Sequence, residues 1–330
     1  MNFLTKAWYS KNPLLYSLVP FSLLYCLGAK LKKFCYSAGW KKISHFPVPI
    51  IVVGNITVGG TGKTPLIIAL AQFFSAQGFK PGIVSRGYGG RANKTPFLVM
   101  ADSDPIESGD EPLLIKRATG CPMVIARSRV AAVQRLLQSA ACDLVLSDDG
   151  LQHYALGRSI EIAVVDGERY FGNGLCLPAG PLREPITRLQ SVDWLVVQGQ
   201  KNGLAAVDMQ LVPGKIYNLH NPELHWNVSR LTQPIHAVAG IGNPQRFFRQ
   251  LRSLGLELVE HAFPDHHRYR PQDFNFPEDA VIIMTEKDAV KCAHFIDHRY
   301  WCLPVTAQCG SGFFQKLLSQ VQVLATKLSS

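Results

Sequence analysis

The first 50 residues contain no acidic side chain, although the whole chain carries 24 Asp and Glu. Seven lysines lie in the same stretch, so the other 280 residues account for only three of the ten formal positive charges. Beyond residue 50 there is no block of interleaved Arg and aromatic residues of the kind that binds nucleic acid. We therefore expect no nucleic-acid partner and assign the basic character to an N-terminal arm.

Paired cysteines are also missing. The eight cysteines are scattered, with no C-x-x-C pair and no Cys/His spacing typical of a metal site. The sequence therefore predicts neither a zinc centre nor a disulfide framework, and the thiols suit a reducing compartment.

A long uninterrupted apolar run is likewise lacking. Residues 14–27 are apolar but contain Pro20, so the run falls short of the ~20 residues that span a bilayer. A signal peptide is not expected, because the sequence lacks a cleavage site of small residues. We predict that residues 1–45 form an amphipathic arm at a membrane interface, with aromatic residues at head-group level and lysines facing anionic phospholipid. The alternative is a helix that covers the core of the same protein.

The most informative feature present is a glycine-rich loop, Thr57-Val-Gly-Gly-Thr-Gly-Lys-Thr64, between an apolar run and a helical pattern. In this setting backbone N–H groups bind phosphates, the lysine neutralises the β- and γ-phosphates, and the last hydroxyl can ligate Mg²⁺. The usual pattern begins with glycine, where this chain has threonine. We predict that ATP is bound by Thr57, Val58, Gly59, Gly60, Thr61, Gly62, Lys63 and Thr64.

From Pro49 onward short apolar runs alternate with helical segments, which predicts an α/β fold with a mostly parallel sheet wrapped by helices. We assign residues 46–230 to this P-loop domain and residues 231–330 to a smaller α/β domain that closes a cleft over it. The expected strands are 50–53, 82–85, 97–100, 122–125, 144–147, 161–165 and 194–197, with 235–239 and 280–284 in the smaller domain.

Polar residues that follow these strands are candidates for the site, because ligands of parallel sheets bind at the carboxyl ends of strands. The loop Ser85-Arg-Gly-Tyr-Gly-Gly-Arg91 could bind an anionic or sugar-bearing ligand or could be a plain surface turn. Asp110 and Glu111 begin a helix, where they could cap it, hold Mg²⁺ or accept a proton from a hydroxyl.

Asp148 and Asp149 end an apolar run downstream of the glycine-rich loop, the usual position of the second half of an Mg·ATP site. Two adjacent carboxylates would be costly to bury without a cation. Gln152 and His153 follow directly, and Arg183 lies in a later loop as another cation for a phosphate.

Six motifs in this order resemble the tetraacyldisaccharide 4′-kinase (lipid A 4′-kinase) family, and together they extend over nearly the whole chain. They are Gly54-Asn-Ile-Thr-Val-Gly-Gly-Thr-Gly-Lys-Thr-Pro65, Ser85-Arg-Gly-Tyr-Gly89, Gly109-Asp-Glu-Pro112, Asp148-Asp-Gly-Leu-Gln-His153, Pro178-Ala-Gly-Pro-Leu-Arg-Glu184 and Thr285-Glu-Lys-Asp288.

This resemblance implies a P-loop kinase of Gram-negative outer-membrane synthesis, peripheral to the cytoplasmic face of the inner membrane. It would transfer the γ-phosphate of ATP, with Mg²⁺, to the 4′-hydroxyl of a tetraacylated glucosamine disaccharide 1-phosphate, giving lipid IVA. A substrate with four acyl chains stays in the bilayer, so its enzyme must come to the interface, and the arm would bring it there. The rival hypothesis is a membrane-recruited P-loop ATPase that acts as a switch, and the sequence predicts no particular protein partner.

The resemblance also implies roles for individual residues. Asp110 corresponds to the residue that deprotonates the acceptor hydroxyl, His266 to the histidine that orients it, and Lys63 to the catalytic phosphate-binding lysine. The metal would be held by Thr64, Glu111, Asp148 and Asp149. Contacts to the disaccharide or to ATP are implied for Asn55, Arg86, Tyr88, Arg129, Gln152, His153 and Arg183.

Overall fold

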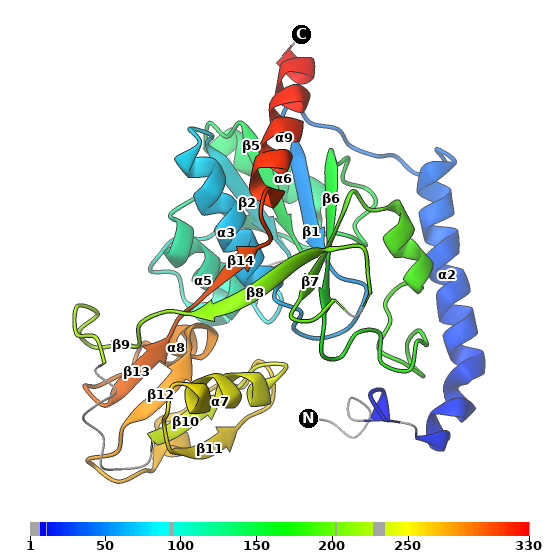
Figure 1. The fold of residues 1–330 in the computed structure, drawn as a ribbon. Coiled ribbons are helices and arrows are strands. Elements are labelled where there is room, and N and C mark those ends of the chain that lie inside the picture. The colour runs from blue at the N-terminus through cyan, green and yellow to red at the C-terminus, as the bar shows by residue number, and fades with distance from the viewer. Residues whose placement is uncertain (1–6, 11, 93–94, 202, 227–234, 330) are drawn as a thin grey trace.

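Two β-sheets organise the chain in the computed structural model, which describes residues 7–10, 12–92, 95–201, 203–226 and 235–329 (Figure 1). The larger sheet is mostly parallel, with antiparallel pairs only at its two edges among the described strands. In spatial order it contains β14 (Val305–Cys309), β8 (Val207–Pro213), β7 (Trp194–Gln198), β6 (Ile160–Asp166), β1 (Ile50–Gly54), β5 (Leu144–Asp148), β2 (Pro81–Ser85), β4 (Met123–Ile125) and β3 (Phe97–Leu98).

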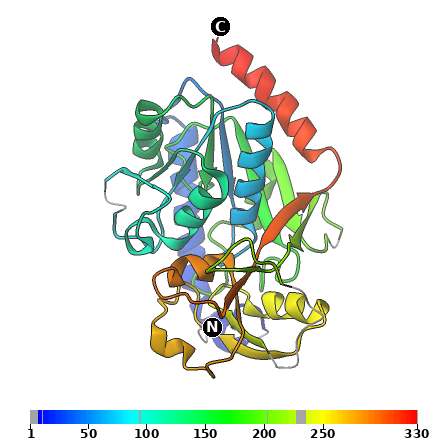
Figure 2. The same cartoon turned by 90° about the vertical axis from the view of Figure 1, so that its left-hand side faces the viewer.

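Helices cover both faces of this sheet (Figure 2). Side chains alternate between the faces along a strand, so that Ile51 and Val53 of β1 join one core cluster and Ile50 and Val52 join the other. Because both faces are buried, the strands form continuous apolar runs in the sequence. One face packs against α3 (Lys63–Ala76), α5 (Asp110–Thr119) and α9 (Phe313–Ser329), and the other against α6 (Arg129–Ser139).

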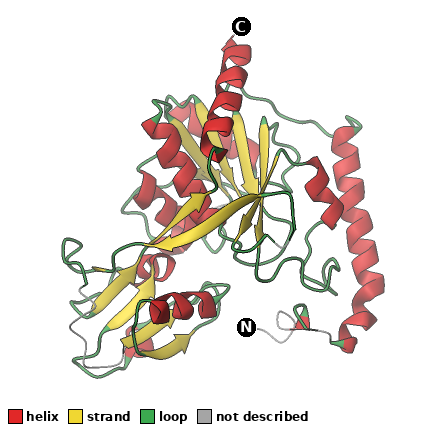
Figure 3. Ribbon diagram, viewed as in Figure 1, coloured by secondary structure: helices red, strands yellow, loops and turns green. Residues whose placement is uncertain are grey.

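A smaller sheet lies beside the larger one and has its own core clusters (Figure 3). Its spatial order is β11 (Leu258–Ala262), β10 (Ile235–Ala239), β12 (Ile282–Thr285), β13 (Tyr300–Leu303) and β9 (Tyr217–Asn218), with helices α7 (Pro244–Ser253) and α8 (Glu286–Cys292). Short helical turns complete the fold at α4 (Pro105–Ser108), η3 (Ile186–Ser191) and η5 (Pro271–Phe274).

The sheets do not follow the predicted division into residues 46–230 and 231–330. The boundary itself lies within residues 227–234, outside the described residues. Strand β9 already belongs to the smaller sheet, whereas β14 and α9 return to the larger one. Strand β14 pairs antiparallel with β8, and Phe313 and Leu317 of α9 are buried in the larger core. The prediction was wrong here because periodicity reveals a strand but not the sheet that it joins.

The N-terminal arm is helical over Pro13–Ser37, as η1 (Pro13–Leu18) followed by α2 (Val19–Ser37). Pro20 lies in the first turn of α2, where a missing N–H breaks no helical hydrogen bond. The prediction that proline shortens the apolar stretch is therefore wrong: this helix is long and apolar enough to cross a membrane, by length and composition only.

The arm makes hydrogen bonds to the rest of the protein, while most of its large apolar side chains are exposed. The Ser22 hydroxyl donates to the Cys176 carbonyl at 2.6 Å and accepts from the Ala179 N–H at 2.9 Å. Phe21 and Leu24 are 60% and 67% exposed, and Leu14, Tyr16, Leu23, Leu27, Leu31 and Phe34 are also more than half exposed. The helix therefore does not cover the core of its own protein, and the amphipathic arm expected from the sequence is confirmed.

Candidate active site

The phosphate-binding loop connects the end of β1 to the start of α3, as the sequence predicts. Gly59 and Gly62 have φ angles of 106° and 89°, a region in which a side chain would be strained. The buried Asn55 amide donates to the Gly59 carbonyl at 3.3 Å, and the Val58 N–H donates to the Pro181 carbonyl at 2.8 Å. Contacts behind the loop thus set its shape.

Lys63, Asp149 and Arg183, which come from three separate motifs, lie together. The Lys63 ammonium is 3.5 Å from Asp149 Oδ1, and Arg183 Nη1 donates to Asp149 Oδ2 at 2.8 Å. Burial alone would raise the pKa of Asp149, but the charges of Lys63 and Arg183 outweigh it and hold that pKa well below its ordinary value. The site therefore pairs a permanent carboxylate with two cations that can also bind phosphate.

Asp148 is a buried carboxylate at the end of β5. Its Oδ2 accepts from the Ser85 hydroxyl at 3.0 Å, while its Oδ1 has no hydrogen-bond partner among the described residues. Burial, followed by the negative charges of Glu111 and Asp149, raises the pKa of Asp148 to about 6. An unpartnered buried carboxylate oxygen is unfavourable unless a cation joins it, and oxygen ligands of this kind suit Mg²⁺.

The full set of metal ligands implied by the resemblance is not assembled by the protein alone. Within the described ranges no three His, Cys, Asp or Glu side chains are close enough to hold a metal ion. Glu111 is engaged by Lys287 at 2.8 Å, and Asp149 by Arg183. Kinase Mg²⁺ is generally held by one or two carboxylates together with substrate phosphates. Asp148, with its unpartnered buried oxygen, fits this arrangement, and the motif offers the Thr64 hydroxyl in the first turn of α3 as a further oxygen ligand.

Asp110 and His266 meet, although 156 positions separate them. Asp110 begins α5, and His266 lies in the loop after β11 with a φ of 60°. His266 Nδ1 is 3.2 and 3.1 Å from the two carboxylate oxygens. Burial would raise the pKa of Asp110, but the His266 hydrogen bond and Lys287 lower it to about 2. Burial would lower the pKa of His266, and its hydrogen bond to Asp110 raises it overall.

Lys287, from the start of α8, is a site residue that sequence reasoning missed. Its ammonium lies 2.8 Å from Glu111 Oε1, 3.1 Å from Asp265 Oδ1 and 3.8 Å from Asp110 Oδ2. Burial would lower its pKa, but these carboxylates raise it well above the ordinary value, so the lysine stays charged. The available signals were its place in the Thr285-Glu-Lys-Asp288 motif and its position near the carboxyl end of β12.

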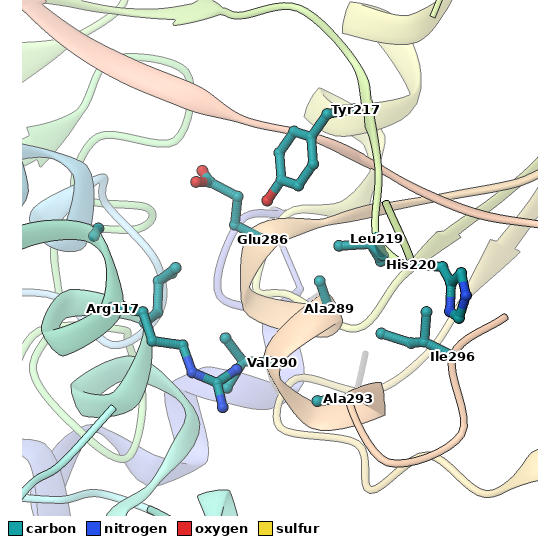
Figure 4. Close-up of a pocket in the computed structure, with 11 residues that line it drawn as sticks. Arg117, Tyr217, Leu219, His220, Glu286, Ala289, Val290, Ala293 and Ile296 are labelled. Atoms are coloured by element: carbon teal, nitrogen blue, oxygen red, sulfur yellow. The ribbon is translucent and has the colours of Figure 1, made fainter. Parts of the chain in front are cut away.

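Glu286 and Lys287, the first two residues of α8, point into different surroundings. Whereas Lys287 contacts Glu111 and Asp265, Glu286 lines a cavity of about 410 Å³ between α5 and α8, where Figure 4 shows it near the Tyr217 ring. Burial raises the pKa of Glu286, which accepts from the Val305 N–H at 3.0 Å. This cavity contains none of the predicted site residues.

The comparisons with known proteins agree with this geometry. A family model described as tetraacyldisaccharide-1-P 4′-kinase matches residues 14–322. The chain belongs to this family. A Coxiella burnetii (strain RSA 331 / Henzerling II) protein named tetraacyldisaccharide 4′-kinase is 50% identical over 319 residues, covering 95% of this chain and 94% of the relative. A Nitrosococcus oceani protein of the same name is 47% identical, covering 97% and 94%.

A solved structure supports the same conclusion. The fold matches the structure titled "apo" form LpxK from Aquifex aeolicus in complex with ATP, with a TM-score of 0.79 and 27% identity over 94% of this chain and 99% of that one. The resemblance inferred from the six motifs is therefore confirmed, as are the α/β fold, the kinase activity in lipid A biosynthesis and the use of ATP with Mg²⁺.

Three residues of this kinase for which the resemblance implied ligand contacts make hydrogen bonds within the protein. Asn55 supports the phosphate loop. The buried Arg129 donates to the backbone carbonyls of Asp148 at 2.8 Å and Ala126 at 3.2 Å, and burial lowers its pKa to about 10. Gln152 donates to Glu184 at 2.7 Å and to the Asn55 carbonyl at 3.1 Å.

Arg86, Tyr88 and His153 keep positions compatible with a ligand contact. Arg86 is exposed, and the exposed Tyr88 ring lies with its centroid 5.1 Å from that of the His266 ring, beside the contact between His266 and Asp110. Burial, together with the charges of Arg129, Lys32 and Arg86, lowers the pKa of His153 to about 3, so this ring is neutral at physiological pH. A neutral imidazole can both donate and accept a hydrogen bond.

Proposed function

We propose that Asp110 and His266 act on the 4′-hydroxyl of a membrane-embedded tetraacylated glucosamine disaccharide 1-phosphate while the phosphate loop holds ATP. The observation that carries the proposal is the contact of His266 Nδ1 with both Asp110 oxygens, which joins the two sheets at the start of α5. A P-loop ATPase switch has no acceptor hydroxyl and needs no such base.

Positioning and charge stabilisation supply most of the catalysis, because the transition state for phosphoryl transfer is loose and its charge is spread over the phosphoryl oxygens. The N–H groups of the phosphate loop and the Lys63 ammonium bind those oxygens, and Arg183 lies within reach of the same charge. When bound by Asp148 and Thr64, Mg²⁺ would neutralise the β- and γ-phosphates.

Asp110 orients the acceptor hydroxyl and takes its proton as the hydroxyl oxygen bonds to the γ-phosphorus. The bond from that phosphorus to the β,γ-bridging oxygen of ATP breaks, and ADP leaves. Its low pKa keeps it ionised at neutral pH but makes it a weak base, so correct placement matters more than basicity. The Nδ1–H of His266 fixes the carboxylate, and the Glu111 N–H donates to Asp110 Oδ1 at 3.0 Å. Lys287 neutralises the neighbouring carboxylates and so permits them to lie close together.

An assay of acceptor dependence tests this function. Purified protein with γ-labelled ATP should transfer label to tetraacyl disaccharide 1-phosphate in vesicles and release little phosphate without acceptor. The matched control is the same lipid already phosphorylated at the 4′ position, which should accept no label. Phosphate release that is equally fast without acceptor would instead support the ATPase switch.

We also infer that α2 attaches the enzyme to the membrane at the cytoplasmic face of the inner membrane, where ATP is available. The outward apolar side chains of α2 support this inference, since a bilayer is the solvent that suits them. Lys32 and Lys33 instead bind the protein itself, through the Gln152 carbonyl and the Ser191 hydroxyl at 3.0 Å each. Apolar contact therefore contributes more to attachment than these two lysines do.

Replacing Phe21, Leu24 and Leu31 together by glutamine should lower binding to anionic vesicles by at least about tenfold, because even one such side chain that is fully buried in an apolar phase contributes ~1.5–3 kcal/mol. The fold should persist, since all three side chains point outward. Vesicle co-sedimentation measures the effect. Val323→Gln, at an exposed apolar position on α9, is the matched control. Unchanged co-sedimentation of the triple variant would contradict membrane attachment by α2.

Substitution is a sharper test than deletion of the arm. Trp8 and Leu15 pack against Val58 of the phosphate loop and against Leu177. Removing them would disturb nucleotide binding together with membrane binding.

A further inference from the structure

Arg169 connects the phosphate loop to the smaller sheet. It lies in the loop after β6, and its side chain is 17% exposed. Its Nη2 donates to the Gly60 carbonyl at 2.7 Å, and its Nη1 donates to the Gly242 carbonyl at 3.2 Å. Its Nε donates to Asp166 Oδ2 at 3.1 Å. One guanidinium thus contacts three segments that are far apart in the sequence.

The turn that contains Gly242 lies directly on the phosphate loop. It connects β10 to α7 of the smaller sheet. A Cβ atom at Gly242 would lie 3.0 Å from the Gly60 backbone nitrogen and 3.5 Å from Asp265 Oδ2. This close approach explains a glycine at position 242, where φ is not in the left-handed region.

Ion pairs around Asp166 reinforce the same junction. Asp166 is 2% exposed and ends β6, where its Oδ1 also accepts from Arg246 of α7 at 2.9 Å. A second pair, Arg249 with Glu168 at 2.6 Å, links the same elements but is about half exposed on both sides. Arg169 is therefore held in place by a buried carboxylate that itself contacts the smaller sheet.

Peptide geometry explains what the Arg169 contact does. The Gly60 carbonyl and the Thr61 N–H belong to one planar trans peptide, so they point in opposite directions. A guanidinium that holds the carbonyl on one side therefore directs the Thr61 N–H to the other side. In a glycine-rich loop with little rotational restraint, such a contact selects one of several available peptide orientations.

We infer that Arg169 is a positioning residue, which holds the Gly60–Thr61 peptide in its phosphate-binding orientation while the smaller sheet is docked against the loop. The guanidinium has its full set of acceptors only when the Gly242 turn is in place. Docking of the smaller sheet and affinity for ATP are therefore coupled through one side chain. The inference depends on ATP binding by the loop and is independent of the roles of Asp110 and His266.

Steady-state kinetics of Arg169→Ala test the inference. We expect the KM for ATP to rise about tenfold, as for a lost charge-assisted hydrogen bond, with kcat within about threefold of wild type. The KM for the lipid acceptor should not change. Arg169→Lys, which keeps the charge but cannot bridge both carbonyls, should restore part of the loss. Arg249→Ala is the matched control and should stay within about twofold of wild type, because its ion pair is exposed.

A second variant approaches the same contact from the other side. Gly242→Ala adds a methyl group against the Gly60 nitrogen and should also raise the KM for ATP, whether or not Arg169→Ala accumulates as folded protein. Direct titration with a non-hydrolysable ATP analogue, without acceptor, should show the same loss of affinity in both. A normal KM for ATP in Arg169→Lys and Gly242→Ala, or a lower kcat with unchanged KM in Arg169→Ala, would overturn the inference and leave Arg169 a purely structural residue.

Discussion

Lys63→Met is expected to lower kcat/KM for ATP by roughly 10³-fold, the upper range for loss of one group that stabilises transition-state charge. The ammonium lies in the first turn of α3 and reaches Asp149 at 3.5 Å. A methionine of similar length preserves packing and removes only the charge. Phosphoryl transfer to the lipid acceptor, measured with labelled ATP, provides the rate.

The fold should tolerate this change, because Asp149 keeps its hydrogen bonds to Arg183 at 2.8 and 3.1 Å. The melting temperature should therefore stay close to that of the wild type. Lys201→Met is the control: it removes a lysine from an exposed ion pair with Asp208 and should leave the rate unchanged. Turnover of Lys63→Met near the wild-type level would contradict the proposed role of the phosphate loop.

Asp110→Asn and His266→Gln should each lower kcat by roughly 10²–10⁴-fold, the range for general-base catalysis. If the pair acts as one unit, the double variant should be little slower than the poorer single variant. Asp110→Asn is isosteric and His266→Gln is of similar size, so both changes largely preserve packing while they remove the carboxylate or the imidazole. The KM for ATP should change little, since neither residue contacts the phosphate loop in the contacts described above.

His267→Gln is the matched control for this cycle. His267 is the next residue in the chain and binds Asp273 at 2.9 Å instead of Asp110. Its replacement should leave kcat near the wild-type value. If the kcat of the double variant falls by the product of the two single losses, Asp110 and His266 do not act as one unit. A normal kcat in His266→Gln would show that the histidine has no part in catalysis.

Much of the phosphate-binding edge follows from local sequence. Gly59 and Gly62 adopt positive φ angles that favour glycine, and Asp148 follows a run of buried residues in β5. These are short-range effects, because backbone freedom and strand periodicity depend on a few neighbouring residues. The family resemblance implied the pairing of Asp110 with His266, which no local pattern indicates.

Other features depend on contacts between distant segments. Arg129 carries a charge that suggests a ligand contact, yet it is buried against the backbone of Asp148. Lys287 and Arg169 each contact residues more than 70 positions away in the sequence. The outward orientation of α2 and the return of β14 to the larger sheet are of the same kind. The direction and burial of a side chain depend on what packs against it, and for these elements the packing partners come from remote parts of the chain.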